Sequence, residues 1–262
     1  MRVRIAAPAL TGAIALGVLA MPATAFAATA GPVITKAVSP SADLGLGGTI
    51  TLGTTITATD ASGIKAIYAE PYPVALVQQY GGAPTAAELK ADAADSLLKV
   101  ESKTATSQTA GVSETDKILA SDKMPDEFAG TWGVAVLVVA NNGTSTFNVK
   151  ATTYNWQRAD KLTSKVSATK VRKGANLTIT GQLDRANWAT DAYQDYDSQS
   201  VLLEFLKTGA TTWTTVKHVT SSNGGALTAT VEDSTAGSWR YVYAGNSTSG
   251  AAASAQTSVG LE

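Results

Sequence analysis

Three carboxylates within seven residues form the densest acidic motif of the chain: Asp191, Asp195 and Asp197. We expect this segment to be a loop between two strands. Ca²⁺ takes about six to eight oxygen ligands, which carboxylates can supply. The spacing is not that of an EF-hand, whose loop needs a glycine near its middle and a glutamate at its end. Two interpretations therefore stay open, a calcium site over residues 191–197 and an acidic loop exposed to solvent.

The same segment carries three aromatic residues, Trp188, Tyr193 and Tyr196. A flat ring can stack on the face of a sugar, so these side chains could form the contact surface of a carbohydrate-binding module. Alternatively, they pack the end of a β-sandwich, because aromatic side chains bury a large apolar area. The sequence leaves both interpretations open.

Residues that could act as catalytic acids, bases or nucleophiles form no recognisable pattern. The chain has no cysteine and one histidine, which excludes thiol nucleophiles, disulfides and thiolate metal sites. His218 lies in an expected surface strand, and no Gly-x-Ser-x-Gly motif accompanies it. A second acidic cluster, Asp122, Asp126 and Glu127, is interleaved with lysines, as in a salt-bridged surface. We expect no catalytic residues and no enzyme.

Short β-strands must position these side chains in the second half of the chain. The alternation of Trp239, Tyr241 and Tyr243 with other residues predicts a strand with one aromatic face. Turn residues such as those of Ser222–Gly225 separate such segments. The expected strands are 166–171, 177–183, 201–206, 213–219, 226–231 and 239–243. Strands and turns at this spacing predict an antiparallel sandwich.

The first half has the same character, with one irregular insertion around residues 74–128. Strands are expected at 33–38, 49–59, 64–70, 132–140 and 144–153. Within the insertion, Thr85 and Glu88 have the spacing of a capping box, which predicts a helix, and a second helical start is expected at Ser113. The sequence thus predicts an all-β fold with two domains, residues 28–158 and 159–262, joined near Asp160–Thr163.

Residues 1–27 have the layout of a secretory signal peptide, with Arg2 and Arg4 before an apolar run and small residues around Ala27. The apolar run is shorter than the ~20 residues of a membrane-spanning helix. We therefore expect a secreted, extracellular protein without a membrane anchor. Lysine plus arginine total 20 against 21 aspartate plus glutamate, and no basic block points to a nucleic-acid partner.

Several short motifs lie along both halves of the chain: Ala58–Lys65, Pro71–Pro73, Pro84–Leu89 and Gly130–Trp132 in the first half, and Gly174–Leu183, Trp213, Gly224–Leu227 and Gly237–Gly245 in the second. On these motifs, both halves resemble immunoglobulin-like modules of exported actinobacterial proteins. The resemblance implies two antiparallel β-sandwich domains and no activity, and some similar proteins carry a calcium-binding label. We expect a non-catalytic binding or structural protein whose partner is an extracellular protein or polysaccharide. The alternatives are a calcium-binding protein, with calcium as the one expected cofactor, and a carbohydrate-binding module.

Overall fold

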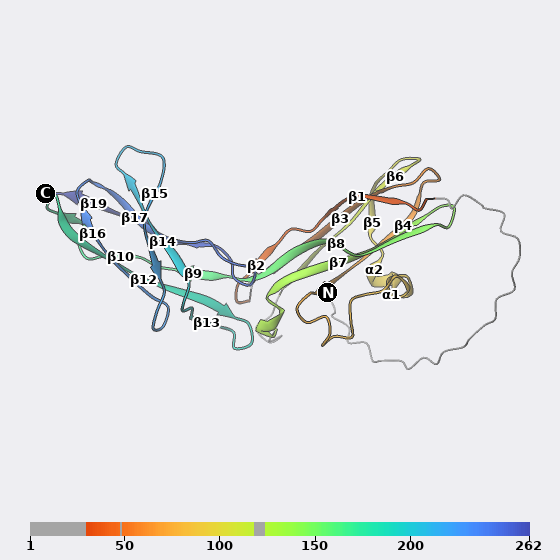
Figure 1. Cartoon of the computed structure of the whole chain (residues 1–262), viewed down its shortest axis with the longest axis horizontal. Helices are drawn as coiled ribbons and strands as arrows, with labels where there is room; N and C mark the ends of the chain where they lie inside the picture. The colour runs from red at the N-terminus through yellow and green to blue at the C-terminus, as the bar shows by residue number, and fades with distance from the viewer. Residues whose placement is uncertain (1–29, 48, 118–123) are drawn as a thin grey trace, which may run out of the picture. The chain divides into compact units, whose positions relative to one another are not determined.

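The computed structural model describes residues 30–47, 49–117 and 124–262, and strands make up most of them (Figure 1). The predicted signal peptide lies outside the described residues. No helix in the described part of the chain is long and apolar enough to span a membrane. Two compact units are present. Unit 1 comprises the described residues within 1–40, 51–114 and 131–154, and unit 2 those within 41–50, 115–130 and 155–262.

Unit 1 is a β-sandwich whose strand order is that of an immunoglobulin constant-type domain. One sheet has the order β1 (Val33–Val38), β3 (Thr49–Thr59), β6 (Ser107–Lys117) and β5 (Lys99–Lys103). The other has β4 (Ile64–Pro73), β7 (Gly130–Ala140) and β8 (Ser145–Arg158) side by side, and the end of β8 pairs with β2 (Ala42–Leu44). Labelled A to G along the chain, the seven strands β1, β3, β4, β5, β6, β7 and β8 form the sheets ABED and CFG.

The insertion of unit 1 is partly helical, as predicted. Helices α1 (Ala86–Ala91) and α2 (Ala93–Ser96) follow β4, and the Thr85–Glu88 capping box is present. The helical start expected at Ser113 is wrong, because β6 continues through Lys117. Polar residues with hydroxyl and carboxylate side chains fit a helix start or a strand equally well, and here they continue β6, which pairs with β3 in its sheet.

Unit 2 is a second sandwich with antiparallel strands. Its first sheet contains β10 (Lys165–Val166), β12 (Ala175–Asn187), β16 (Ala226–Asp233), β9 (Asp160–Leu162) and β13 (Ala192–Asp195). The second contains β11 (Lys170–Val171), β19 (Thr257–Leu261), β17 (Gly237–Tyr243), β14 (Ser200–Lys207), β15 (Thr214–Thr220) and β18 (Ala252–Ala253). Strand β11 follows β10 in the chain but belongs to the second sheet, because it pairs in parallel with β19. The order is again immunoglobulin-like.

The core of unit 2 confirms the predicted aromatic face of β17. Trp239, Tyr241 and Tyr243 are buried while the residues between them are half-buried. The Tyr241 hydroxyl donates a hydrogen bond of 2.8 Å to the carbonyl oxygen of Ile179 on β12, which satisfies a buried polar group across the sandwich.

The boundary between the units differs from the predicted one. Asp160–Leu162 is not a linker but strand β9, in which Leu162 lies opposite Leu183 of β12. Strand β2, from the first half of the chain, pairs in parallel with Trp156–Arg158 and belongs to unit 2. Periodicity along the sequence locates strands but does not specify which distant strand they pair with.

Candidate functional site

The three predicted calcium ligands lie on the β12–β13 hairpin and are not gathered at one point. Asp191 is exposed in the turn, whereas Asp195 is at the other end of β13, opposite Asp184. The Asp197 carboxylate accepts a hydrogen bond of 2.6 Å from the backbone nitrogen of Gly225. Across the described residues, no group of three or more His, Asp or Glu side chains is placed to hold a metal ion. Calcium binding stays a prediction without a ligand set.

Trp188 is in the interior of unit 2, at 4% exposure, so its ring is not available to stack on a sugar. Its indole nitrogen donates a hydrogen bond of 3.0 Å to the Leu44 carbonyl oxygen, and its backbone nitrogen donates one of 2.7 Å to Asp126. The glycan-contact interpretation is therefore wrong for Trp188, and the packing interpretation is confirmed for this residue.

Tyr193 and Tyr196 are half-buried, and a cation covers one ring face of each. The Lys161 ammonium nitrogen is 3.7 Å from the Tyr193 ring centroid, and the Arg185 guanidinium carbon is 3.7 Å from that of Tyr196. Tyr196 also packs edge-on against Tyr243, with the ring centroids 6.0 Å apart. These contacts stabilise the end of the sandwich, and the three aromatic residues do not form a common stacking surface.

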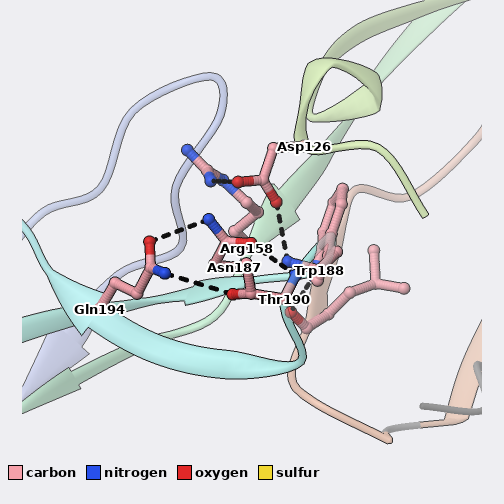
Figure 2. Close-up of polar contacts among 7 residues, drawn as sticks. Asp126, Arg158, Asn187, Trp188, Thr190 and Gln194 are labelled. Carbon is pink, nitrogen blue, oxygen red and sulfur yellow. Dashed lines mark hydrogen bonds and ion pairs between the residues drawn. The ribbon is translucent and has the colours of Figure 1, made fainter. Parts of the chain in front are cut away.

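A polar network joins this hairpin to the preceding segments of unit 2 (Figure 2). Asp126 forms an ion pair of 2.6 Å with Arg158, which is mostly buried, while its other oxygen accepts from Trp188. In the hairpin itself, Asn187 accepts from the Thr190 backbone nitrogen and donates to Gln194. Asp126 is thus salt-bridged as predicted, but to a distant arginine. Glu127 is exposed, and Asp122 lies outside the described residues.

Asp160, in the same region, is a carboxylic acid whose pKa is shifted. Burial raises its pKa to about 6, against the opposing effects of a hydrogen bond from Ser249 and of the nearby Arg185 and Arg158. The Ser249 hydroxyl donates at 2.6 Å to one carboxylate oxygen, and the other oxygen has no hydrogen-bond partner among the described residues. The neighbouring Arg158 pairs with Asp126, and Arg185 lies over the Tyr196 ring, so this network stabilises the fold and offers no free group to a ligand. His218, by contrast, is exposed on β15, as predicted.

One open space that could hold a ligand lies in unit 1. A cavity of about 550 Å³ lies among β4, β7, the end of β8 and the helical insertion. Its walls combine aromatic rings with carboxylates: Tyr72, Tyr80, Trp132 and Tyr154, and Glu70, Asp92 and Asp95. No lysine, arginine or histidine of the described residues lines it.

Local sequence shapes this cavity. Strand β4 is at the edge of its sheet, where proline is tolerated, and it continues through Pro71 and Pro73 to pair with β7. Gly133 is required opposite, because a Cβ atom at this position would meet the Tyr72 ring at 2.7 Å. Helix α1 is anchored to the sheet by Leu89, which is fully buried and packs near Tyr72.

Two polar groups of the cavity have no partner in the described part of the chain. Tyr154 is buried, at 5% exposure, and its ring is 6.4 Å from that of Trp132, but its hydroxyl makes no hydrogen bond there. The Glu70 carboxylate makes neither a hydrogen bond nor an ion pair with a described residue. Burial raises the pKa of Glu70, and the neighbouring Glu88 and Asp92 raise it further. Burial also raises the pKa of Tyr154.

Sequence reasoning missed this cavity because its polar groups come from distant segments. Glu70 ends one predicted strand, Asp92 lies in the insertion and Tyr154 follows another predicted strand. The available signals were indirect, namely the Pro71-x-Pro73 step and an insertion too long for a plain loop.

No protein-family model and no curated protein matches this chain. Among solved structures, it is similar to fibronectin(III)-like modules of Clostridium thermocellum CbhA, with 13% identity over 88% of this chain and 94% of that chain and a TM-score of 0.37. It is also similar to a chimeric titin Z1Z2–Z1Z2 tandem, with 11% identity, 88% and 99% coverage and a TM-score of 0.30. The D00–D0 domain of intimin matches at 11% identity, 87% and 98% coverage and a TM-score of 0.28. Likenesses this weak carry no argument, and the immunoglobulin-like assignment rests on the strand order.

Proposed function

We propose that this chain is a secreted, non-catalytic binding protein and that the unit 1 cavity is its binding site. The observation that carries the proposal is a cavity of about 550 Å³ in which the hydroxyl of a buried tyrosine and a half-buried carboxylate have no described protein partner. Ligand sites are typically concave, with volumes of roughly 300–1,000 Å³, and combine apolar walls with a few polar groups. A cavity of this size accepts a small molecule or one end of a larger extracellular partner.

Secretion is supported by the three-part layout of residues 1–27. The proposal is tested by expressing the full chain in a Gram-positive host and determining the N-terminal sequence of protein recovered from the medium. We expect a mature chain that begins at Ala28. Retention of an uncleaved chain inside the cell would contradict secretion without affecting the proposed binding site.

The binding site is tested by filling it. Ala94 lines the cavity from the exposed side of α2, so Ala94→Trp should occupy the space without disturbing the core. We expect fragments found by ligand-observed NMR, from a library of small amines, aromatics and sugars, to lose binding in this variant. Ala210→Trp, in an exposed turn of unit 2, is the matched control and should keep binding. Fragment binding that is equal in all three proteins would overturn the proposal.

A further inference from the structure

The charged side chains of described residues that line the unit 1 cavity are all acidic. Glu70, Asp92 and Asp95 line it, and Glu88 is close enough to act on Glu70. Like charges in a partly buried site repel one another, and among these carboxylates that of Glu70 is removed from water without a described partner, which is costly. A cationic ligand would relieve both effects, whereas a phosphate or carboxylate ligand would increase them.

The walls beside these carboxylates are aromatic. Trp132 and Tyr154 lie on adjacent strands with their rings 6.4 Å apart, and Tyr72 covers the neighbouring Gly133. Aromatic faces attract cations and also bury the apolar part of a ligand. The cavity is far larger than a bare ion needs, and the described carboxylates do not form a metal-binding group. The chemistry therefore favours an organic cation over a metal ion.

We propose that the unit 1 cavity binds a small organic cation, an ammonium or guanidinium group on an apolar chain. The cationic group lies by Glu70 and Asp92, the apolar chain lies along Trp132 and Tyr72, and the Tyr154 hydroxyl accepts a hydrogen bond from the ligand. This inference rests on the proposed function, because it names the ligand class of the same site.

The test compares three probes of similar length by isothermal titration calorimetry on the full chain near neutral pH. The probes are the diamine cadaverine, the neutral 1,5-pentanediol and the dianion glutarate. We expect cadaverine to bind at least about tenfold more tightly than the diol, and glutarate not to bind. Its affinity should fall between 50 and 500 mM salt, since screening weakens charge attraction. Equal binding of diamine and diol would overturn the inference.

Two variants locate the interaction. Glu70→Gln removes the charge at nearly constant shape and breaks no described protein contact, so it should fold and lose about tenfold or more in cadaverine affinity. Tyr154→Phe should lose a smaller factor, because only a hydrogen bond is removed. Glu232→Gln, the same change on an exposed strand position of unit 2, should leave affinity unchanged. Unaltered affinity in Glu70→Gln would refute the assignment.

The outcomes separate this inference from the proposed function. If a neutral sugar or aromatic fragment binds, is blocked by Ala94→Trp and is indifferent to Glu70→Gln, the cavity is a binding site but the cation assignment is wrong. If no fragment or diamine binds in a manner sensitive to Ala94→Trp, both proposals fail. Circular dichroism and thermal melting of each variant confirm that the comparison is made between folded proteins.

Discussion

Single glycines fix the backbone of the β15–β16 turn in unit 2. Gly225 has φ of +75°, a region that other residues rarely adopt, and a Cβ atom there would fall against the Leu183 carbonyl oxygen. Its backbone nitrogen also holds the Asp197 carboxylate. Gly209 has a similar φ of +83°, but nothing lies within 4 Å of the corresponding Cβ position. Substitutions at these two positions therefore distinguish the cost of a positive φ from the cost of steric overlap.

Gly225→Ala should destabilise the protein far more than Gly209→Ala. We expect about 1 kcal/mol for Gly209→Ala, from the positive φ alone, and about 3–5 kcal/mol for Gly225→Ala, where overlap with β12 is added. Urea unfolding of both variants and the unsubstituted chain measures the difference. Equal losses would show that β12 yields to the added methyl group, contrary to the tight packing described.

Residue types predicted the turn, but not its packing. Ser222–Gly225 was predicted as a turn from its composition, and the structure has that turn. That Gly225 touches Leu183 depends on the pairing of β12 with β16, which no local pattern specifies. The same limit applies to the cavity, which Glu70 and Tyr154 line together only after the sheets have formed. For Trp188 the sequence left packing and glycan contact open, and its partners Leu44 and Asp126 could not be read from it.

At the scale of elements, strand β9 carries a carboxylate into the polar network of unit 2. The pKa of Asp160 in the folded protein is about 6, above its ordinary value of 3.8, mainly because of burial. Between these values the folded state holds a proton that the unfolded state releases. This group therefore stabilises the folded state relatively at low pH, and the stabilisation is lost as pH rises through about 6.

Asp160→Asn should remove this pH dependence while keeping an oxygen to accept from Ser249. Relative to the unsubstituted chain, we expect the variant to gain about 1–2 kcal/mol in free energy of unfolding between pH 4 and pH 7. The full shift at about 1.4 kcal/mol per pKa unit would give about 3 kcal/mol, and solvent screening of the half-buried carboxylate reduces it. Urea unfolding at several pH values measures the gain. Asp191→Asn, at an exposed turn, is the control and should show no such trend. A constant difference across the pH range would contradict the assignment.

Strands of the second half were predictable because each has a clear alternation or a well-defined turn. Expected strands at 201–206 and 239–243 correspond to β14 and β17. The helix after Thr85 was also predictable, since a capping box is a local device. The helix expected at Ser113 is wrong because the same polar residues are compatible with a strand, and here they continue β6 beside β3.

At the scale of the whole molecule, unit 2 is assembled from three separate stretches of chain. Residues within 41–50 and 115–130 join 155–262, and they contribute the Leu44 carbonyl and the Asp126 carboxylate to Trp188. The domain boundary predicted at 158/159 would therefore remove both acceptors from the second unit. Buried donors left without acceptors cost about 1–3 kcal/mol each.

A fragment of residues 159–262 should be less stable than the same region in the full chain, by roughly 2–5 kcal/mol if both donors remain buried. Hydrogen exchange measured by NMR tests this directly. We expect the Trp188 indole proton to be protected in the full chain and to exchange rapidly in the fragment. The amide of Tyr241, whose acceptor Ser254 is present in both, is the internal control. Equal protection of the Trp188 indole in both proteins would contradict the division of the units.

The hydrogen bond between Leu44 and Trp188 spans 144 residues, which has a consequence for synthesis. A ribosome adds about 5–20 residues per second, so the carbonyl leaves the exit tunnel roughly 7–30 s before its indole donor. During that interval unit 2 is incomplete, even where the preceding part of the chain has already folded. Premature termination before codon 188 would leave the Leu44 carbonyl without its indole donor.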